Sequence, residues 1–90
     1  MTIHVSSGGD RRWRVDVSDG STTTHDVGIP EGYLEKLGIA GVPAERIIEE
    51  SFRFLLEREP NTSILGRFDL PVIARYFPEF EKEIGRRMKG

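Results

Sequence analysis

Apolar side chains recur along this chain with two different periods. Up to about residue 29 they alternate with polar ones, as in Trp13, Val15 and Val17, which is the pattern of a strand that buries one face. From about residue 30 they recur every three to four residues, as in a helix that buries one side. The pattern predicts an α+β fold in a single domain, residues 1–90, with strands in residues 1–29 and helices in residues 30–90.

The alternating part predicts a three-stranded antiparallel meander. A short first strand holds Ile3 and Val5, and Asp19-Gly20 marks the turn between the second and third strands. A two-residue loop there would mix the two faces, so we favour a three-residue loop with Gly20 left-handed. That register pairs Val17 with Ser21, Val15 with Thr23, and Trp13 with His25. Trp13 and His25 should then share the buried face.

About four helices are predicted after the sheet. The helical spacing indicates Glu31–Leu37, Pro43–Glu59, Leu70–Phe77 and a last helix with the stripe Phe80, Ile84 and Met88. Gly38 should end the first of them, and Pro43 stands near the first helical position of the second.

The helix Pro43–Glu59 is central to the prediction. At 100° per residue its apolar arc spans roughly 200°, whereas about 100° suffices for a helix that faces one core. Such a helix is packed on more than one side, by its own chain or by a second copy. If its own chain cannot cover the arc, the surplus is an interface. The candidate interface residues are Ile47, Phe54, Leu55, Phe77 and Phe80.

Composition narrows the classes of function. The chain has no cysteine, which excludes disulfides, thiolate metal sites and cysteine nucleophiles. No apolar run is long enough to span a membrane, and residues 1–4 do not resemble a signal peptide, so we expect a cytoplasmic protein without a membrane partner. The net charge of −2 lacks the concentrated basic field of most nucleic-acid binders.

No catalytic, metal or cofactor motif is present in the sequence. His4 and His25, with Asp10 or Asp26, lack the spacing of metal ligands, and we expect them to be hydrogen-bonded strand residues. Ser6 has no nucleophile elbow that would turn it into a catalytic serine. The sequence therefore predicts a protein that is not an enzyme and carries no cofactor.

The most basic and aromatic run surrounds Trp13. Arg11, Arg12 and Arg14 are the candidate nucleic-acid contacts, because arginines beside an aromatic ring can hold a single strand. On a strand, however, Arg12 and Arg14 point away from Trp13. That arrangement also suits a solvated sheet face with a buried indole, which is the interpretation we favour.

Residues Asp26–Glu59 resemble a ribbon-helix-helix module. The similarity lies in Val27-Gly28-Ile29-Pro30-Glu31 leading into Tyr33–Leu37, then Gly41 and Glu45–Phe52. The resemblance implies a strand that pairs with its copy across a dimer and enters the DNA major groove, as in an antitoxin-like regulator. The predicted strand offers Thr22, Thr24 and Asp26 on its polar face, with no Arg, Lys, Asn or Gln to read a base.

A second resemblance covers Ser51–Glu81. The wording Ser51–Pro60, Ser63–Pro71 and Arg75–Glu81 is similar to a group of short uncharacterised bacterial proteins, and it implies no activity. Taken together, the sequence predicts a small non-catalytic interaction or structural protein whose partner is a protein, namely a second copy of itself in a homodimer. The DNA-binding regulator is the alternative.

Overall fold

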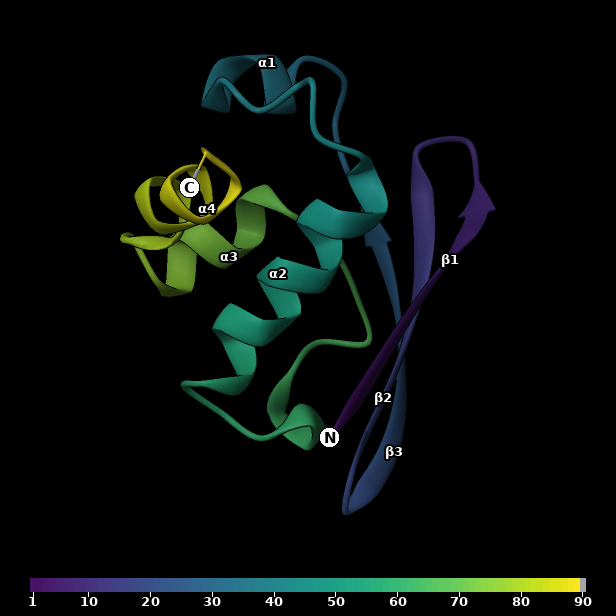
Figure 1. Ribbon diagram of the computed structural model, residues 1–90. Coiled ribbons are helices and arrows are strands. Elements are labelled where there is room, and N and C mark those ends of the chain that lie inside the picture. The colour runs from purple at the N-terminus through teal and green to yellow at the C-terminus, as the bar shows by residue number, and fades with distance from the viewer. Residues whose placement is uncertain (90) are drawn as a thin grey trace.

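Strands precede helices along the chain, as the change of period predicts. The structure, a computed structural model, describes residues 1–89, and all the helices lie on one side of the sheet (Figure 1). Its elements, in chain order, are β1 (Thr2–Gly9), β2 (Arg12–Asp19), β3 (Ser21–Gly28), α1 (Tyr33–Leu37), α2 (Ala44–Leu56), the 3₁₀ helix η1 (Asn61–Ser63), β4 (Arg67–Asp69), α3 (Pro71–Tyr76) and α4 (Phe80–Lys89).

The sheet has the order β1-β2-β3-β4, and its first three strands form the predicted antiparallel meander. The fourth strand, β4, was not predicted. It pairs in parallel with the end of β3, where Val27 lies opposite Phe68. A segment of three residues with one apolar side chain is too short to show the alternation that predicts a strand. It reaches the sheet only because the chain crosses over through α1 and α2.

The β2–β3 turn is centred on Gly20, which is left-handed as predicted, with φ 81°. The predicted pairing, however, is wrong by two residues. Because β2 continues to Asp19 and β3 begins at Ser21, the strands pair Val17 with Thr23, Val15 with His25, and Trp13 with Val27. A shift of two keeps every side chain on its face. His25 is therefore buried and Trp13 half-buried on the same face.

The hydrophobic core surrounds α2 on two sides. The ring of Phe52 packs against His25 of β3 at 5.2 Å and against Phe68 of β4 at 6.0 Å. The ring of Phe54 lies 5.2 Å from that of Phe80 and 6.0 Å from that of Phe77, next to α3. The wide apolar arc of this helix is thus covered by its own sheet and its own C-terminal helices.

This packing corrects the placement of the candidate interface. The chain itself buries Ile47, Phe54, Leu55 and Phe80, and Phe77 is half-buried. The physical reason is that the sheet and α4 cover opposite sides of α2. These side chains stabilise the monomer and are not an exposed interface.

Two arginines, Arg58 just after α2 and Arg87 in α4, hold α4 on α2. Arg87 donates to both carboxylate oxygens of Glu57 at 2.9 Å and to Glu83 at 3.0 Å. The guanidinium of Arg58 lies 3.6 Å from the ring centre of Phe54 and donates to Glu79 at 3.3 Å. A cation over an aromatic face is attracted by the ring quadrupole, so both arginines contribute packing as well as charge.

The carboxylates around Arg87 give a pH-dependent prediction. Hydrogen bonds from Arg86 and Arg87 lower the pKa of Glu83 to about 2, and Arg87 lowers that of Glu57. Since these pKa values lie below the ordinary 4.5, the stabilisation is present above that pH and is lost as the pH falls through the lowered values. Urea unfolding at stepped pH should show this loss. The loss should be smaller in Arg87→Met, and an equal loss in that variant would contradict the assignment.

Candidate interaction surface

The outer face of the sheet is covered by ion pairs. Arg12 binds Asp26 at 3.0 Å and Asp69 at 2.8 Å, which ties β2 to β3 and β4. Arg14 pairs with Asp16 at 3.2 Å on the same face. Positive and negative side chains alternate across the strands, so this surface has no field of one sign that would attract a polyanion.

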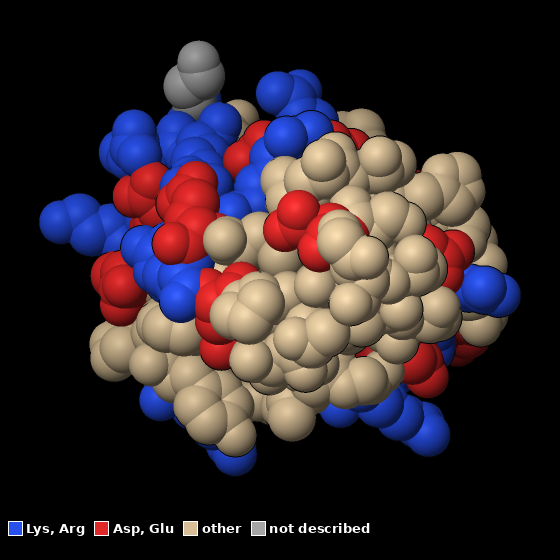
Figure 2. Space-filling model, turned by 90° about the horizontal axis from the view of Figure 1, so that it is seen from below, with Lys and Arg blue, Asp and Glu red and all other residues tan. Residues whose placement is uncertain are grey.

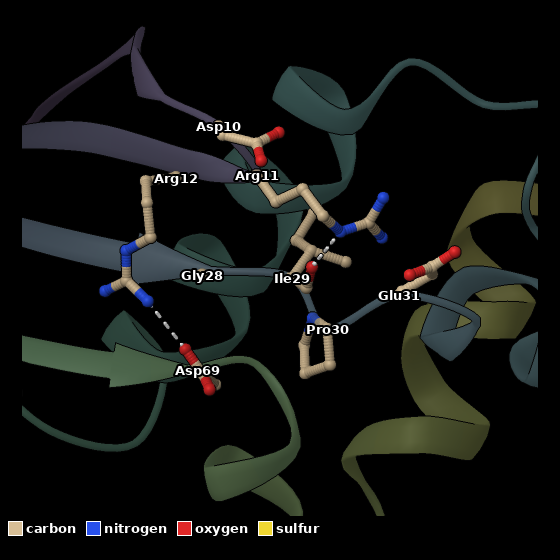
Figure 3. Close-up of a pocket in the computed structure, with 8 residues that line it drawn as sticks. All are labelled: Asp10, Arg11, Arg12, Gly28, Ile29, Pro30, Glu31 and Asp69. Carbon is tan, nitrogen blue, oxygen red and sulfur yellow. Dashed lines mark hydrogen bonds and ion pairs between the residues drawn. The ribbon is translucent and has the colours of Figure 1, made fainter.

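A small hollow of about 200 Å³ opens where β2 begins and where β3 and β4 end (Figure 3). Arg11 spans its rim, with Nε donating to the carbonyl of Ile29 at 3.0 Å, while the backbone N–H of Ile29 donates to Arg11 at 3.2 Å. Arg12 crosses directly over Gly28 to reach Asp69, and a Cβ at Gly28 would overlap both side chains. The arginines of this hollow hold the sheet together.

The three candidate nucleic-acid contacts are therefore not gathered into a basic surface. Arg11 bonds a backbone carbonyl, and Arg12 and Arg14 are each paired with an aspartate. Trp13 is half-buried on the opposite face, so its ring is not a stacking platform for bases. The arrangement matches the interpretation favoured from the sequence, a solvated sheet face with the indole on the core side.

His25 belongs to a buried hydrogen-bond network. Its Nδ1 lies 2.7 Å from the carbonyl of Leu65, which only accepts, so Nδ1 carries the proton. Its Nε2 then accepts from the hydroxyl of Thr23 at 2.8 Å, and Thr23 accepts from Asn61 at 3.1 Å. Both ring nitrogens are occupied within the chain, which suits a structural histidine.

Nothing in residues 1–89 gathers three or more histidines and carboxylates as metal ligands. His4 lies opposite Asp16 on the outer face, far along β1 from the turn that holds Asp10. Ser6 shares that outer face, whereas His25 points into the core, so the two do not form a nucleophile and base.

The second edge of β3 is occupied by its own chain. Asn61 donates from its side chain to the carbonyl of Ser21 at 2.9 Å, and the N–H of Asp26 donates to Gly66 at 2.8 Å. Farther along, Gly28 accepts from Leu70 at 2.9 Å. A ribbon-helix-helix dimer needs a free edge on this strand. Here β3 lies between β2 and the segment Asn61–Asp69. The geometry therefore does not support the pairing of β3 with its copy that the resemblance implies.

The edge of β1 is different, since no segment of residues 1–89 pairs with its outer side. The bond from the N–H of Ile29 to the carbonyl of Arg11 continues the β2–β3 ladder by one pair. In an antiparallel ladder, every second residue of a strand directs its N–H and C=O to the same neighbouring strand. Odd-numbered residues of β2 thus bond β3, and even-numbered ones bond β1. Because His4 lies opposite Asp16, the residues of β1 that direct their backbone N–H and C=O outward are Ile3, Val5 and Ser7.

The edge of β1 also lacks the features that keep strand edges apart. Natural proteins protect an edge with charged side chains, proline, a bulge or a very short strand. Thr2–Gly9 has eight residues without proline, lysine, arginine, aspartate or glutamate, and its one bulge lies at the far end, between Ser7 and Gly9. Ile3 and Val5 are half-buried beside the core. Our sequence reasoning missed this edge, although the uncharged run was its signal.

The start of β1 lies in a region that we call the charge-poor end, made of residues 1–2, 17–22 and 60–63. Thr2 pairs with Ser18, and Asn61 bonds Ser21, which brings the three segments together. Asp19 is their single charged residue. Viewed from this end, uncharged atoms fill most of the middle of the surface, with most charged side chains toward its rim (Figure 2). Met1, which is 64% exposed, adds apolar area there.

No protein-family model matches this chain, and neither the curated proteins nor the solved structures give a match. In the described part of the chain, no helix combines the length and the apolar composition that crossing a bilayer requires.

Proposed function

We propose that this chain is a non-catalytic interaction protein that self-associates through the free edge of β1. The observation that carries the proposal is an eight-residue edge strand whose outer side residues 1–89 leave unpaired and which has no lysine, arginine, aspartate, glutamate or proline. Such an edge is a template for strand addition, because each outward N–H and C=O gains a partner when another strand docks.

Two further features support the same surface. Arg12 and Arg14 on the outer face of the sheet pair with aspartates of the same face, and the aromatic side chains of α2 are buried, so these groups are already engaged within the chain. The first half of β1 adjoins the charge-poor end, and the centres of protein interfaces are likewise depleted of charged residues. We keep the cytoplasm as the proposed location, which fractionation of the source cells would test.

Val5→Pro tests the edge directly. Val5 directs its N–H outward, so proline there removes a donor from the interface and none from the β1–β2 ladder. We expect the wild type to have the mass of a dimer by light scattering at high micromolar concentration, and Val5→Pro to have the mass of a monomer. The circular dichroism spectrum should be unchanged.

Val5→Thr is the matched control, because it keeps both the β-branched shape and the N–H and should remain dimeric. A wild type that stays monomeric at high micromolar concentration would contradict the proposal of self-association. A folded Val5→Pro variant that remains fully dimeric would move the interface away from β1.

A further inference from the structure

The free edge restricts how a second copy can dock, given the proposed function. In an antiparallel pair, residues that direct their N–H and C=O across the interface must lie opposite one another. On β1 these are Ile3, Val5 and Ser7 in both copies. A twofold axis can therefore pass through a residue of β1 but not between two residues. The possible centres are Ile3, His4, Val5 and Ser6.

Side chains on the core side choose among these four registers. With His4 on the axis, Ile3 of each copy lies opposite Val5 of the other, and the strands overlap from Thr2 to Ser6. With Val5 on the axis, Ile3 lies opposite the hydroxyl of Ser7. With Ser6 on the axis, Val5 lies opposite Ser7. With Ile3 on the axis, the strands overlap only over Thr2–His4. Register follows the hydrophobic pattern where one face is buried, which favours His4.

We propose that two copies join β1 to β1 in antiparallel orientation with His4 on the twofold axis, so that the two sheets become one. This inference rests on the proposed self-association. The occupant is a second copy because the pattern of the edge is self-complementary. Ile3 and Val5 are both half-buried, and Ile3 of each copy would cover Val5 of the other, so the contact occurs twice. Thr2–Gly9 has no lysine, arginine, aspartate or glutamate that would meet its own kind across the axis.

The outer face is compatible with the same register. Thr2 of one copy would lie opposite Ser6 of the other, so hydroxyls meet hydroxyls. The two His4 side chains would lie side by side on the axis, each flanked by Asp16 of its own β2, which is its cross-strand partner. The carboxylates compensate any positive charge on the paired imidazoles. The axis also lies near the charge-poor end rather than near the bulge.

Cysteine cross-linking reads the register directly, because the natural chain has no cysteine. Directly opposed residues in an antiparallel pair have Cβ atoms about 4.5–5.5 Å apart, close to the spacing of a disulfide. Mild oxidation should convert most of His4→Cys into a covalent dimer. The matched controls Ile3→Cys, Val5→Cys and Ser6→Cys each lie on the axis of a competing register and should stay largely uncross-linked. A non-reducing gel measures this, with circular dichroism to confirm folding.

Each outcome separates the two proposals. Preferential cross-linking at position 3, 5 or 6 would overturn the His4 register and leave self-association through β1 in place. A wild type that is dimeric by light scattering, with no cross-link at any of the four positions, would overturn the β1–β1 pairing while self-association stands. A monomeric wild type with no cross-link would overturn both.

Discussion

Phe52→Ala is expected to lower the free energy of unfolding by about 3–5 kcal/mol, the usual cost of removing a core phenylalanine. Phe52 is fully buried, and its ring joins α2 to both His25 and Phe68. An alanine would leave a cavity at the point where α2 meets β3 and β4. Because β4 has only three residues, this contact adds to the short β3–β4 ladder and the Arg12–Asp69 ion pair that hold it.

Urea denaturation followed by circular dichroism measures the effect. Phe52→Leu is the matched control: it keeps most of the apolar volume and should cost less than about 1.5 kcal/mol. A loss below about 1 kcal/mol in Phe52→Ala would show that the ring is not a core contact, since losses of this kind ordinarily exceed that value.

Phe54→Ala is expected to destabilise the monomer by a similar amount, about 3–5 kcal/mol. On a helical wheel Phe54 lies at the border of the apolar arc, where an interface anchor would also lie. In the fold its ring is fully buried between Phe80 and the guanidinium of Arg58. Alanine therefore removes an aromatic pair and a cation–π contact together with apolar burial.

The measurement is urea unfolding at low micromolar concentration, where a dimer contributes little to the observed stability. Tyr76→Ala is the aromatic control, because Tyr76 is 67% exposed on α3 and its replacement should change stability by no more than about 0.5 kcal/mol. If Phe54→Ala changed the dimer mass but not the stability of the monomer, Phe54 would be an interface residue after all.

Local patterns in the sequence predicted most of the secondary structure. The alternation around Val15 predicted the meander and its buried face, because successive side chains of a strand point to opposite sides. Gly20 and Gly38 marked the turn and the end of α1, and both are left-handed in the structure. The stripe Phe80, Ile84 and Met88 predicted α4. Each of these features depends on neighbours within a few residues, so the sequence contains its cause.

The segments that pack around α2 could not be predicted from the sequence. Its wide apolar arc showed that two sides needed cover, but a helical wheel does not distinguish cover by the same chain from cover by a copy. Contacts between residues far apart in the chain decided this, with Phe68 on one side and Phe80 on the other.

The same limit applied to polar groups. The side chain of Asn61 bonds carbonyls of the β2–β3 hairpin about forty residues earlier, and no local pattern indicates such distant partners.

The candidate surface likewise has some features that the sequence determines and others that only the tertiary structure decides. A first strand of a meander lies at an edge, so the sequence by itself determined that Ile3 and Val5 stand in an edge strand and that no charge protects it. The tertiary structure alone decided that the second side of β3 is occupied, because Asn61 and Arg67–Asp69 return to this strand after the crossover. Local periodicity specifies which residues form a strand, whereas the chain segments that reach its edges are chosen by packing around α2.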